Sequence, residues 1–230
     1  MFYFDYSYII FVLPALLLSI FAQYKVQNTF KKYSQIRMMR NYTGAEVARE
    51  ILDANGLNHI RVERVSGNLT DHYDPRNGVI RLSEGVHDSS SVAAVGVAAH
   101  EAGHAVQYGC GYFPIKVRNA ILPVANFGST LSWPLVFLGI LLGGSFLFLI
   151  DIGILLFSAV VLFQFVTLPV EFNASRRAVQ IIESRGIVSD EERGGAAKVL
   201  RAAALTYVAA LAVSIGNLFR LILIRNNRRS

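Results

Sequence analysis

Residues 91 to 109 read SVAAVGVAAHEAGHAVQYG, and this stretch of small apolar residues carries His100, Glu101 and His104. The serines at positions 89 to 91 can cap a helix that holds the whole stretch. Residues four apart project from one face of a helix, so His100 and His104 can bind one zinc ion at about 2.0 to 2.1 Å. Glu101 follows His100 directly and is placed to take a proton from an attacking water.

The residues around the histidines are small, and they predict room for a close-packed second helix and for substrate: Ala98, Ala99, Ala102 and Gly103. A single histidine on an apolar helix face is more often a hydrogen-bonded core residue than a metal ligand. Two histidines at this spacing with a glutamate between them favour a metal site.

A catalytic zinc ion takes three protein ligands and leaves the fourth position open. The candidates for the third ligand are Glu171, Asp151, His72 and Asp74. Glu171 follows Pro169 at the end of an apolar stretch and is the best placed of the four. His72 and Asp74 lie in a strand and turn region, where capping of the turn or contact with substrate is the alternative role.

The composition indicates a membrane protein, because 53% of the 230 residues are hydrophobic and only 17% are charged. About 20 apolar residues are needed to cross a bilayer as a helix. Residues 6–24 predict a transmembrane anchor, with a secretory signal as the alternative, and residues 119–170 predict a transmembrane hairpin that turns near Asp151. Residues 202–224 predict a fourth span or an interfacial helix.

The net charge of +6 comes from basic residues beside the apolar stretches, which predicts that these flanks share the cytoplasmic side. The same scatter argues against a nucleic-acid partner, and the lipid bilayer is the expected one. Cys110 is the only cysteine, so no disulfide within the chain is possible.

The residues between the first two apolar stretches, 41–118, predict a small cytoplasmic catalytic domain. Thr43 and Glu46 form a capping-box pattern that opens a helix through about Asn55. Strands are expected at 59–66 and 79–83, and the second could serve as an edge to which an extended peptide pairs. Residues 171–201 predict a cytoplasmic helix with the third zinc ligand. The fold class expected is therefore a mainly α membrane protein, with three or four transmembrane helices and a small α+β domain.

The motifs HEAGHAVQ (100–107), PVEFNASRRA (169–178) and LTDHYDPRNGVIRLS (69–83) resemble the YugP-like family of neutral zinc metallopeptidases of bacterial membranes. More distantly, the chain is similar to the HtpX and prenyl-protease group. The resemblance implies a zincin-like domain with His100, His104 and Glu171 as zinc ligands and Glu101 as general base. Ser175 stands where the distant group has an aspartate, so Ser175, Asn173 or a backbone carbonyl would support a ligand histidine.

The expected activity is hydrolysis of peptide bonds in loops or tails of membrane proteins, with one zinc ion as cofactor. Candidate groups for stabilising the oxyanion or contacting substrate are Arg176, Arg177, His72, Tyr73 and Tyr207. One alternative is an intramembrane protease with Asp151 as ligand. Another is a membrane scaffold in which the metal has only a structural role.

Overall fold

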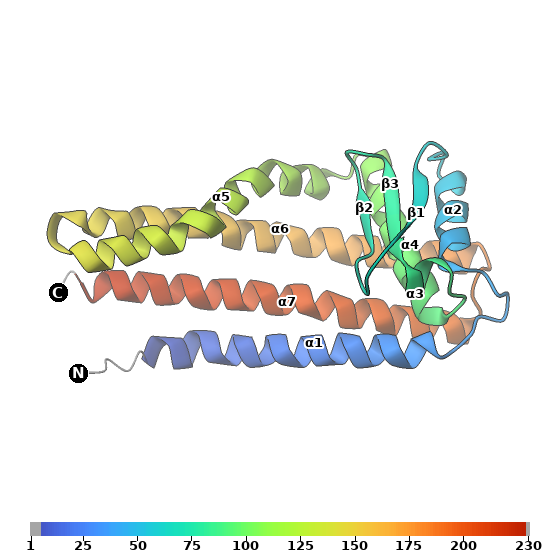
Figure 1. Cartoon of the computed structure of the whole chain (residues 1–230), viewed down its shortest axis with the longest axis horizontal. Coiled ribbons are helices and arrows are strands. Elements are labelled where there is room, and N and C mark those ends of the chain that lie inside the picture. The colour runs from blue at the N-terminus through green and yellow to red at the C-terminus, as the bar shows by residue number, and fades with distance from the viewer. Residues whose placement is uncertain (1–5, 229–230) are drawn as a thin grey trace. The chain divides into compact units, whose positions relative to one another are not determined.

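The computed structural model describes residues 6–228, and the chain divides into two compact units. The helical unit comprises Met1–Gln23, Lys116–Pro169 and Leu205–Ser230, and the α/β unit comprises Tyr24–Ile115 and Val170–Ala204. Four long helices contribute residues to both units: α1 (Leu13–Ser34), α5 (Phe113–Leu142), α6 (Phe148–Ser184) and α7 (Asp190–Asn226) (Figure 1). A short π-helical stretch, Tyr8–Val12, precedes α1.

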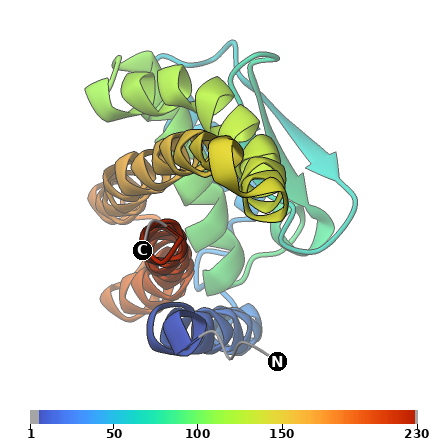
Figure 2. The same cartoon turned by 90° about the vertical axis from the view of Figure 1, so that its left-hand side faces the viewer.

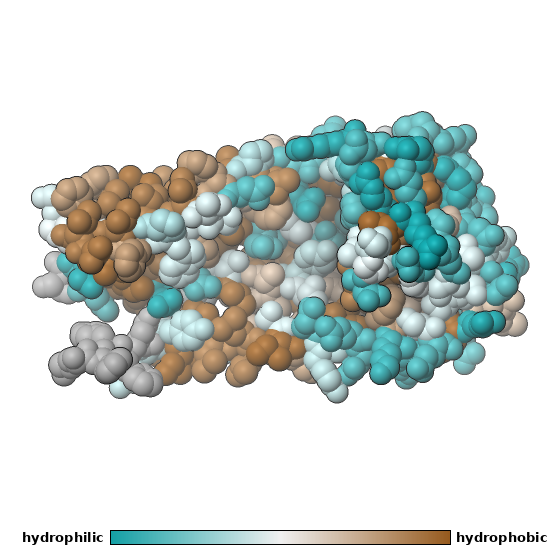
Figure 3. All heavy atoms as spheres, in the orientation of Figure 1, coloured by the Kyte–Doolittle hydropathy of each residue, from teal (hydrophilic) through white to brown (hydrophobic). Residues whose placement is uncertain are grey.

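Within the helical unit the four helices run side by side, as the end-on view in Figure 2 shows. Each is long and apolar enough to cross a membrane. Figure 3 shows a large brown, hydrophobic surface over these helices. The large apolar side chains exposed on them include Leu17, Ile20, Phe137, Leu141, Leu155 and Phe165. An exposed apolar surface of this extent is what lipid, and not water, would cover.

Specific contacts join the helices of this unit. Gly128 of α5 lies against the carbonyl of Leu156 of α6, where a β-carbon would collide with the backbone. Phe11 packs on Phe219 of α7, with ring centroids 5.8 Å apart. The Arg225 guanidinium, near the end of α7, pairs with both carboxylate oxygens of Asp151 at 2.7 and 2.8 Å. The end of α7 is therefore fixed to the first turn of α6.

Three expectations about the helices need correction. The hairpin turns at Gly143 and a short 3₁₀ helix, Gly144–Leu147, and Asp151 already lies in the first turn of α6. Both glycines have positive φ, which a residue with a side chain rarely adopts. The expected single helix over 171–201 is instead the end of α6 and the start of α7, separated by a turn around Gly186. Residues 202–224 are part of α7 and not a separate helix.

The α/β unit contains a three-stranded sheet and three further helices. The strands are β1 (Arg61–Val65), β2 (His72–Asp74) and β3 (Val79–Ser83), and the helices are α2 (Gly44–Ala54), α3 (Glu84–His87) and α4 (Val92–Gly109). The predicted capping box of Thr43 and Glu46 opens α2, and the Ser91 hydroxyl accepts the Ala94 N–H at the start of α4. These two local predictions are confirmed.

The strand order is β1-β3-β2, with β3 parallel to β1 and antiparallel to β2. The prediction that residues 79–83 form an exposed edge is therefore wrong, because β3 is hydrogen-bonded on both sides. The edges are β1 and β2, and β2 packs against α4 through a T-shaped contact between Tyr73 and Tyr108. Asp71 accepts hydrogen bonds from the Ser83 backbone N–H and hydroxyl, which holds the start of β2 against the end of β3.

Helix α4 lies in the core of the α/β unit, with most of its residues buried. A β-carbon on Gly103 would lie 2.8 Å from the Ala174 carbonyl of α6, and one on Gly96 would lie 3.3 Å from the Ala196 side chain of α7. The small residues of the HEAGH stretch thus allow the backbones of α4 and α6 to come into contact, as predicted. This close approach brings the α6 turn that carries Glu171 next to α4.

Candidate metal centre

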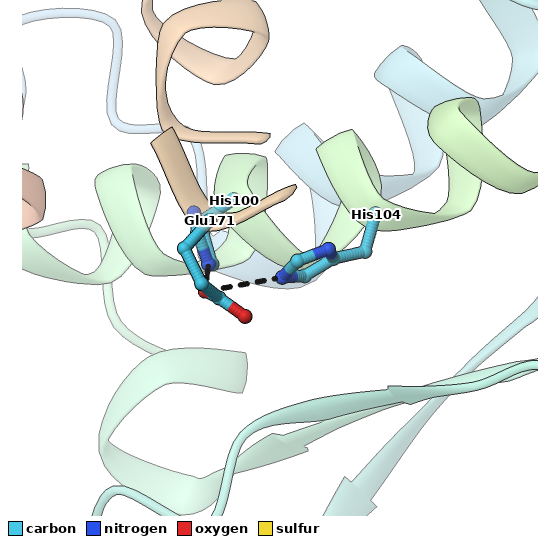
Figure 4. Close-up of side chains that lie close together, drawn as sticks. All are labelled: His100, His104 and Glu171. Atoms are coloured by element: carbon cyan, nitrogen blue, oxygen red, sulfur yellow. Dashed lines mark ion pairs between the residues drawn. The ribbon is translucent and has the colours of Figure 1, made fainter. Parts of the chain in front are cut away.

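Three side chains from α4 and α6 converge in the α/β unit (Figure 4). His100 and His104 lie one helical turn apart on α4, and their Nε2 atoms lie 3.4 and 3.6 Å from Oε2 of Glu171. One donor atom from each of the three residues lies within 4.8 Å of the other two. Among the described residues, this is the group that could hold a metal ion.

The spacing of these atoms fits zinc. Two atoms bound tetrahedrally to one zinc ion at about 2.1 Å lie roughly 3.4 Å apart. Glu171 Oε2 is buried and has no hydrogen-bond partner within residues 6–228. A buried carboxylate oxygen without a partner is costly, and a cation between it and two imidazole nitrogens would remove that cost.

The charges around His104 also favour a cation. Burial alone would lower the pKa of His104, but the Glu171 carboxylate 3.6 Å from its Nε2, together with the negative charge of Glu101, raises it above its ordinary value. The site therefore favours positive charge.

Each histidine has a second polar contact at Nδ1. The Ser175 hydroxyl lies 3.2 Å from Nδ1 of His100, at the position where the distant family group has an aspartate. Oε1 of Gln107 lies 3.1 Å from Nδ1 of His104. Such contacts leave Nε2 free for a metal and fix the orientation of the ring.

Gln107 is a site residue that the sequence interpretation missed. It is fully buried, and its amide nitrogen donates to the Val170 carbonyl at 2.8 Å and to Oδ1 of Asn173 at 3.0 Å. A signal was present, because Gln107 lies three residues after His104 and so on the same helix face. Its partners on α6 could not be read from the sequence.

Glu101 is buried, with 8% of the residue exposed. It makes no hydrogen bond or ion pair with any residue that the structure describes. Glu101 directly follows His100 on α4, and its negative charge contributes to the raised pKa of His104. An unpaired carboxylate next to a metal position is available to accept a proton.

The structure brings Asn173 and Arg177 into contact with this group of residues. Nε of Arg177 donates to Oδ1 of Asn173 at 2.8 Å, and its guanidinium lies over the Tyr112 ring. Arg176 is exposed and points to no partner that the structure describes. Tyr207 belongs to the helical unit.

The other predicted residues are not members of the candidate ligand group. His72 is exposed on β2, and its Nδ1 contacts the Thr70 carbonyl. Asp74 caps the turn before β3, where hydrogen bonds from Asn77 and Arg81 hold the pKa of its carboxyl below the usual range. Burial, together with the nearby charges of Tyr108 and Asp74, raises the pKa of Tyr73.

Residues 8–226 match the sequence profile of a protein family described as "Putative neutral zinc metallopeptidase". The chain belongs to this family. It is 53% identical over 222 residues to the "Putative membrane protease YugP" of Bacillus subtilis (strain 168), which covers 96% of this chain and 98% of that protein. No solved structure matches the chain. The relative and the four apolar helices identify the protein as a membrane protein of a zinc peptidase family.

Proposed function

We propose that the chain is a zinc-dependent endopeptidase that cleaves peptide bonds at the cytoplasmic surface of the membrane. The observation that carries the proposal is the buried, unpartnered Glu171 Oε2, which faces the Nε2 atoms of His100 and His104 at 3.4 and 3.6 Å. These two distances match the edge of a zinc tetrahedron, and three protein ligands are the number that catalytic zinc sites use. Family membership supplies the identity of the metal.

In this proposal His100, His104 and Glu171 hold the zinc ion, and Glu101 is the catalytic residue. When bound, zinc lowers the pKa of a water molecule to about 7 and polarises the scissile carbonyl. Glu101 accepts the proton of the attacking water and passes it to the leaving amine. A site with only a structural metal would need no such base, so the unpaired Glu101 favours catalysis over a scaffold role.

The edge strand β2 is the element that would hold the substrate backbone. Its one free side can pair with an extended peptide through main-chain hydrogen bonds, because β3 occupies only the other side. Tyr73 of β2 contacts Tyr108, one turn beyond His104 on α4, so this strand lies along the helix that carries the ligands. Main-chain pairing favours extended segments with little sequence preference.

The proposed cytoplasmic location rests on the distribution of basic residues. The basic residues that lie between the apolar stretches and the sequence of the α/β unit, or close to those boundaries, are Lys25, Lys31, Lys32, Arg37, Arg40, Lys116, Arg118, Arg176, Arg177 and Arg185. Basic flanks remain in the cytoplasm. The basic tail RNNRRS (225–230) at the end of α7 is the exception, and the bidentate pairing of Arg225 with Asp151 balances one of its charges. We therefore propose that α7 crosses the membrane fully.

The substrate class follows from the place of Glu171 in the chain. Glu171 comes two residues after Pro169, where the apolar stretch of α6 in the helical unit ends. A ligand that follows a membrane span so closely would hold the reaction near the lipid headgroups. Extended loops and tails of membrane proteins can reach such a site more readily than folded soluble proteins.

The test is cleavage of an unfolded casein-type substrate by the purified full chain in detergent. We expect activity that a zinc chelator abolishes and added zinc restores, and that Glu101→Gln lacks. Equal cleavage by wild type and Glu101→Gln would reject the proposed role of Glu101. Cleavage unaffected by chelation would reject the zinc mechanism.

A further inference from the structure

The side chain of Gln107 connects both parts of the candidate metal centre, although it is not itself a ligand. Oε1 of Gln107 meets Nδ1 of His104, and its amide nitrogen meets the carbonyl of Val170, the residue before Glu171. One buried amide therefore contacts a ligand histidine on α4 and the α6 turn that presents the carboxylate. The residues joined by these hydrogen bonds, His104, Gln107, Val170 and Asn173, all lie within the α/β unit.

The direction of each hydrogen bond in this group is determined by its two ends. Arg177 has only donors, so the Asn173 atom that faces its Nε at 2.8 Å must be the amide oxygen. The same oxygen can only accept from Gln107, and the Val170 carbonyl can also only accept. Gln107 must therefore direct its NH₂ group toward α6 and its oxygen toward His104.

The orientation of Gln107 determines which nitrogen of His104 carries the proton. Because Oε1 of Gln107 accepts, Nδ1 of neutral His104 must donate, and Nε2 keeps its lone pair. That lone pair lies 3.6 Å from Glu171 Oε2. His100 has no equivalent constraint, since the Ser175 hydroxyl at its Nδ1 can either donate or accept.

We propose that Gln107, oriented by the Val170 carbonyl and through Asn173 by Arg177, is a positioning residue that fixes His104 as the Nδ1–H tautomer and holds the Glu171 turn of α6 against α4. This inference rests on the proposed zinc site and deepens it. Gln107 acts through His104 and Glu171, so its loss lowers metal affinity first and affects cleavage only as a consequence. Loss of a residue that supports a metal ligand typically costs about 10- to 100-fold in affinity.

The tautomer can be measured directly in the metal-free full-length protein, in detergent at alkaline pH, from the imidazole ¹⁵N shifts of histidine-labelled samples. The His104 signals are assigned by their loss in His104→Asn. We expect one form, protonated at Nδ1, in the wild type and a mixture of both tautomers in Gln107→Leu, which removes the acceptor at Nδ1. A His104 protonated at Nε2 in the wild type, or an unchanged single form in Gln107→Leu, would overturn the inference. This readout needs neither zinc nor substrate, so it can fail while proteolysis stands, or hold while proteolysis fails.

Zinc affinity, measured by chelator competition, gives the second readout. We expect a loss of about 10- to 100-fold in Gln107→Leu, a smaller loss in Arg177→Met, and no further loss when both changes are combined. The exposed Gln180 of α6 provides the control, because Gln180→Leu makes the same change of side chain away from the site. Unchanged affinity in Gln107→Leu, or losses that add in the double variant, would contradict the proposed chain of contacts. If Gln107→Leu does not fold, the Arg177→Met measurements decide.

Discussion

Asp151 and Arg225 form a bidentate ion pair that ties the first turn of α6 to the end of α7, with N–O distances of 2.7 and 2.8 Å. The same carboxylate was a sequence candidate for the third zinc ligand. Its pairing with Arg225 gives it a different role within the helical unit. Glu171, and not Asp151, shares a cluster with His100 and His104.

Asp151→Asn should therefore lower thermal stability and leave bound zinc unchanged. The amide cannot balance the charge of Arg225, whose NH1 is already buried without a hydrogen-bond partner within the described residues. Glu171→Ala should lose the bound zinc, because it removes a proposed ligand. Thermal unfolding and metal content of the two purified variants check both outcomes. Loss of zinc in Asp151→Asn would instead support the intramembrane mechanism.

The proposed orientation predicts which cysteines can be labelled from outside the cell. In a variant lacking Cys110, a cysteine at the exposed Asn68 should resist a membrane-impermeant thiol reagent in intact cells and react after lysis. A cysteine at the exposed Ser145, in the turn between α5 and α6, should react before lysis. The reverse pattern at the two positions would place the α/β unit outside.

Gly103→Ala should destabilise the α/β unit by about 1 to 3 kcal/mol, because the added methyl group would overpack a close contact. Its β-carbon would lie 2.8 Å from the Ala174 carbonyl, and α4 and α6 would have to separate. Zinc affinity should fall as well, since the same two helices supply the ligands. The control is Gly194→Ala in α7, where no atom lies within 4 Å of the new carbon. Equal unfolding temperatures for the two variants would mean that the close contact of Gly103 with Ala174 does not limit the stability of the α/β unit.

Substrate cuts should lie in cytoplasmic loops or tails near the transmembrane ends of membrane proteins. The reason is the short chain distance between Glu171 and the apolar part of α6. Terminal-peptide mass spectrometry of cells producing wild type or Glu101→Gln would locate the cuts that depend on activity. A majority of such cuts in soluble proteins, or on the outer face of the membrane, would be inconsistent with this placement.

The features that the sequence predicted well depend on neighbours in the chain. Thr43 with Glu46 and Ser91 with Ala94 form caps within three residues, so their patterns could be read directly. The spacing of His100 and His104 similarly implied one face of a helix. The existence of a hairpin within 119–170 could be predicted, but its turn was expected near Asp151 and lies instead at Gly143 and Gly144, where φ is positive.

The features that were missed depend on partners far along the chain. β2 has only three residues and includes an aspartate, which strands disfavour, and its pairing places β3 in the centre of the sheet. No pattern in the neighbouring sequence indicates that β3 also pairs in parallel with β1. The contacts of Gln107 with Val170 and Asn173 span more than 60 residues of sequence, as does the pairing of Asp151 with Arg225. Such contacts follow from the packing of helices and not from a motif.

The most direct test of the central claim compares bound zinc with peptide cleavage in the same preparations of wild type, Glu101→Gln and Glu171→Ala. Bound zinc is measured by elemental analysis and cleavage with an unfolded protein substrate. We predict about one zinc ion per chain in wild type and Glu101→Gln, cleavage by wild type alone, and neither zinc nor cleavage in Glu171→Ala. Full zinc and cleavage in Glu171→Ala, or cleavage by Glu101→Gln, would contradict the assignment of Glu171 as ligand or of Glu101 as base.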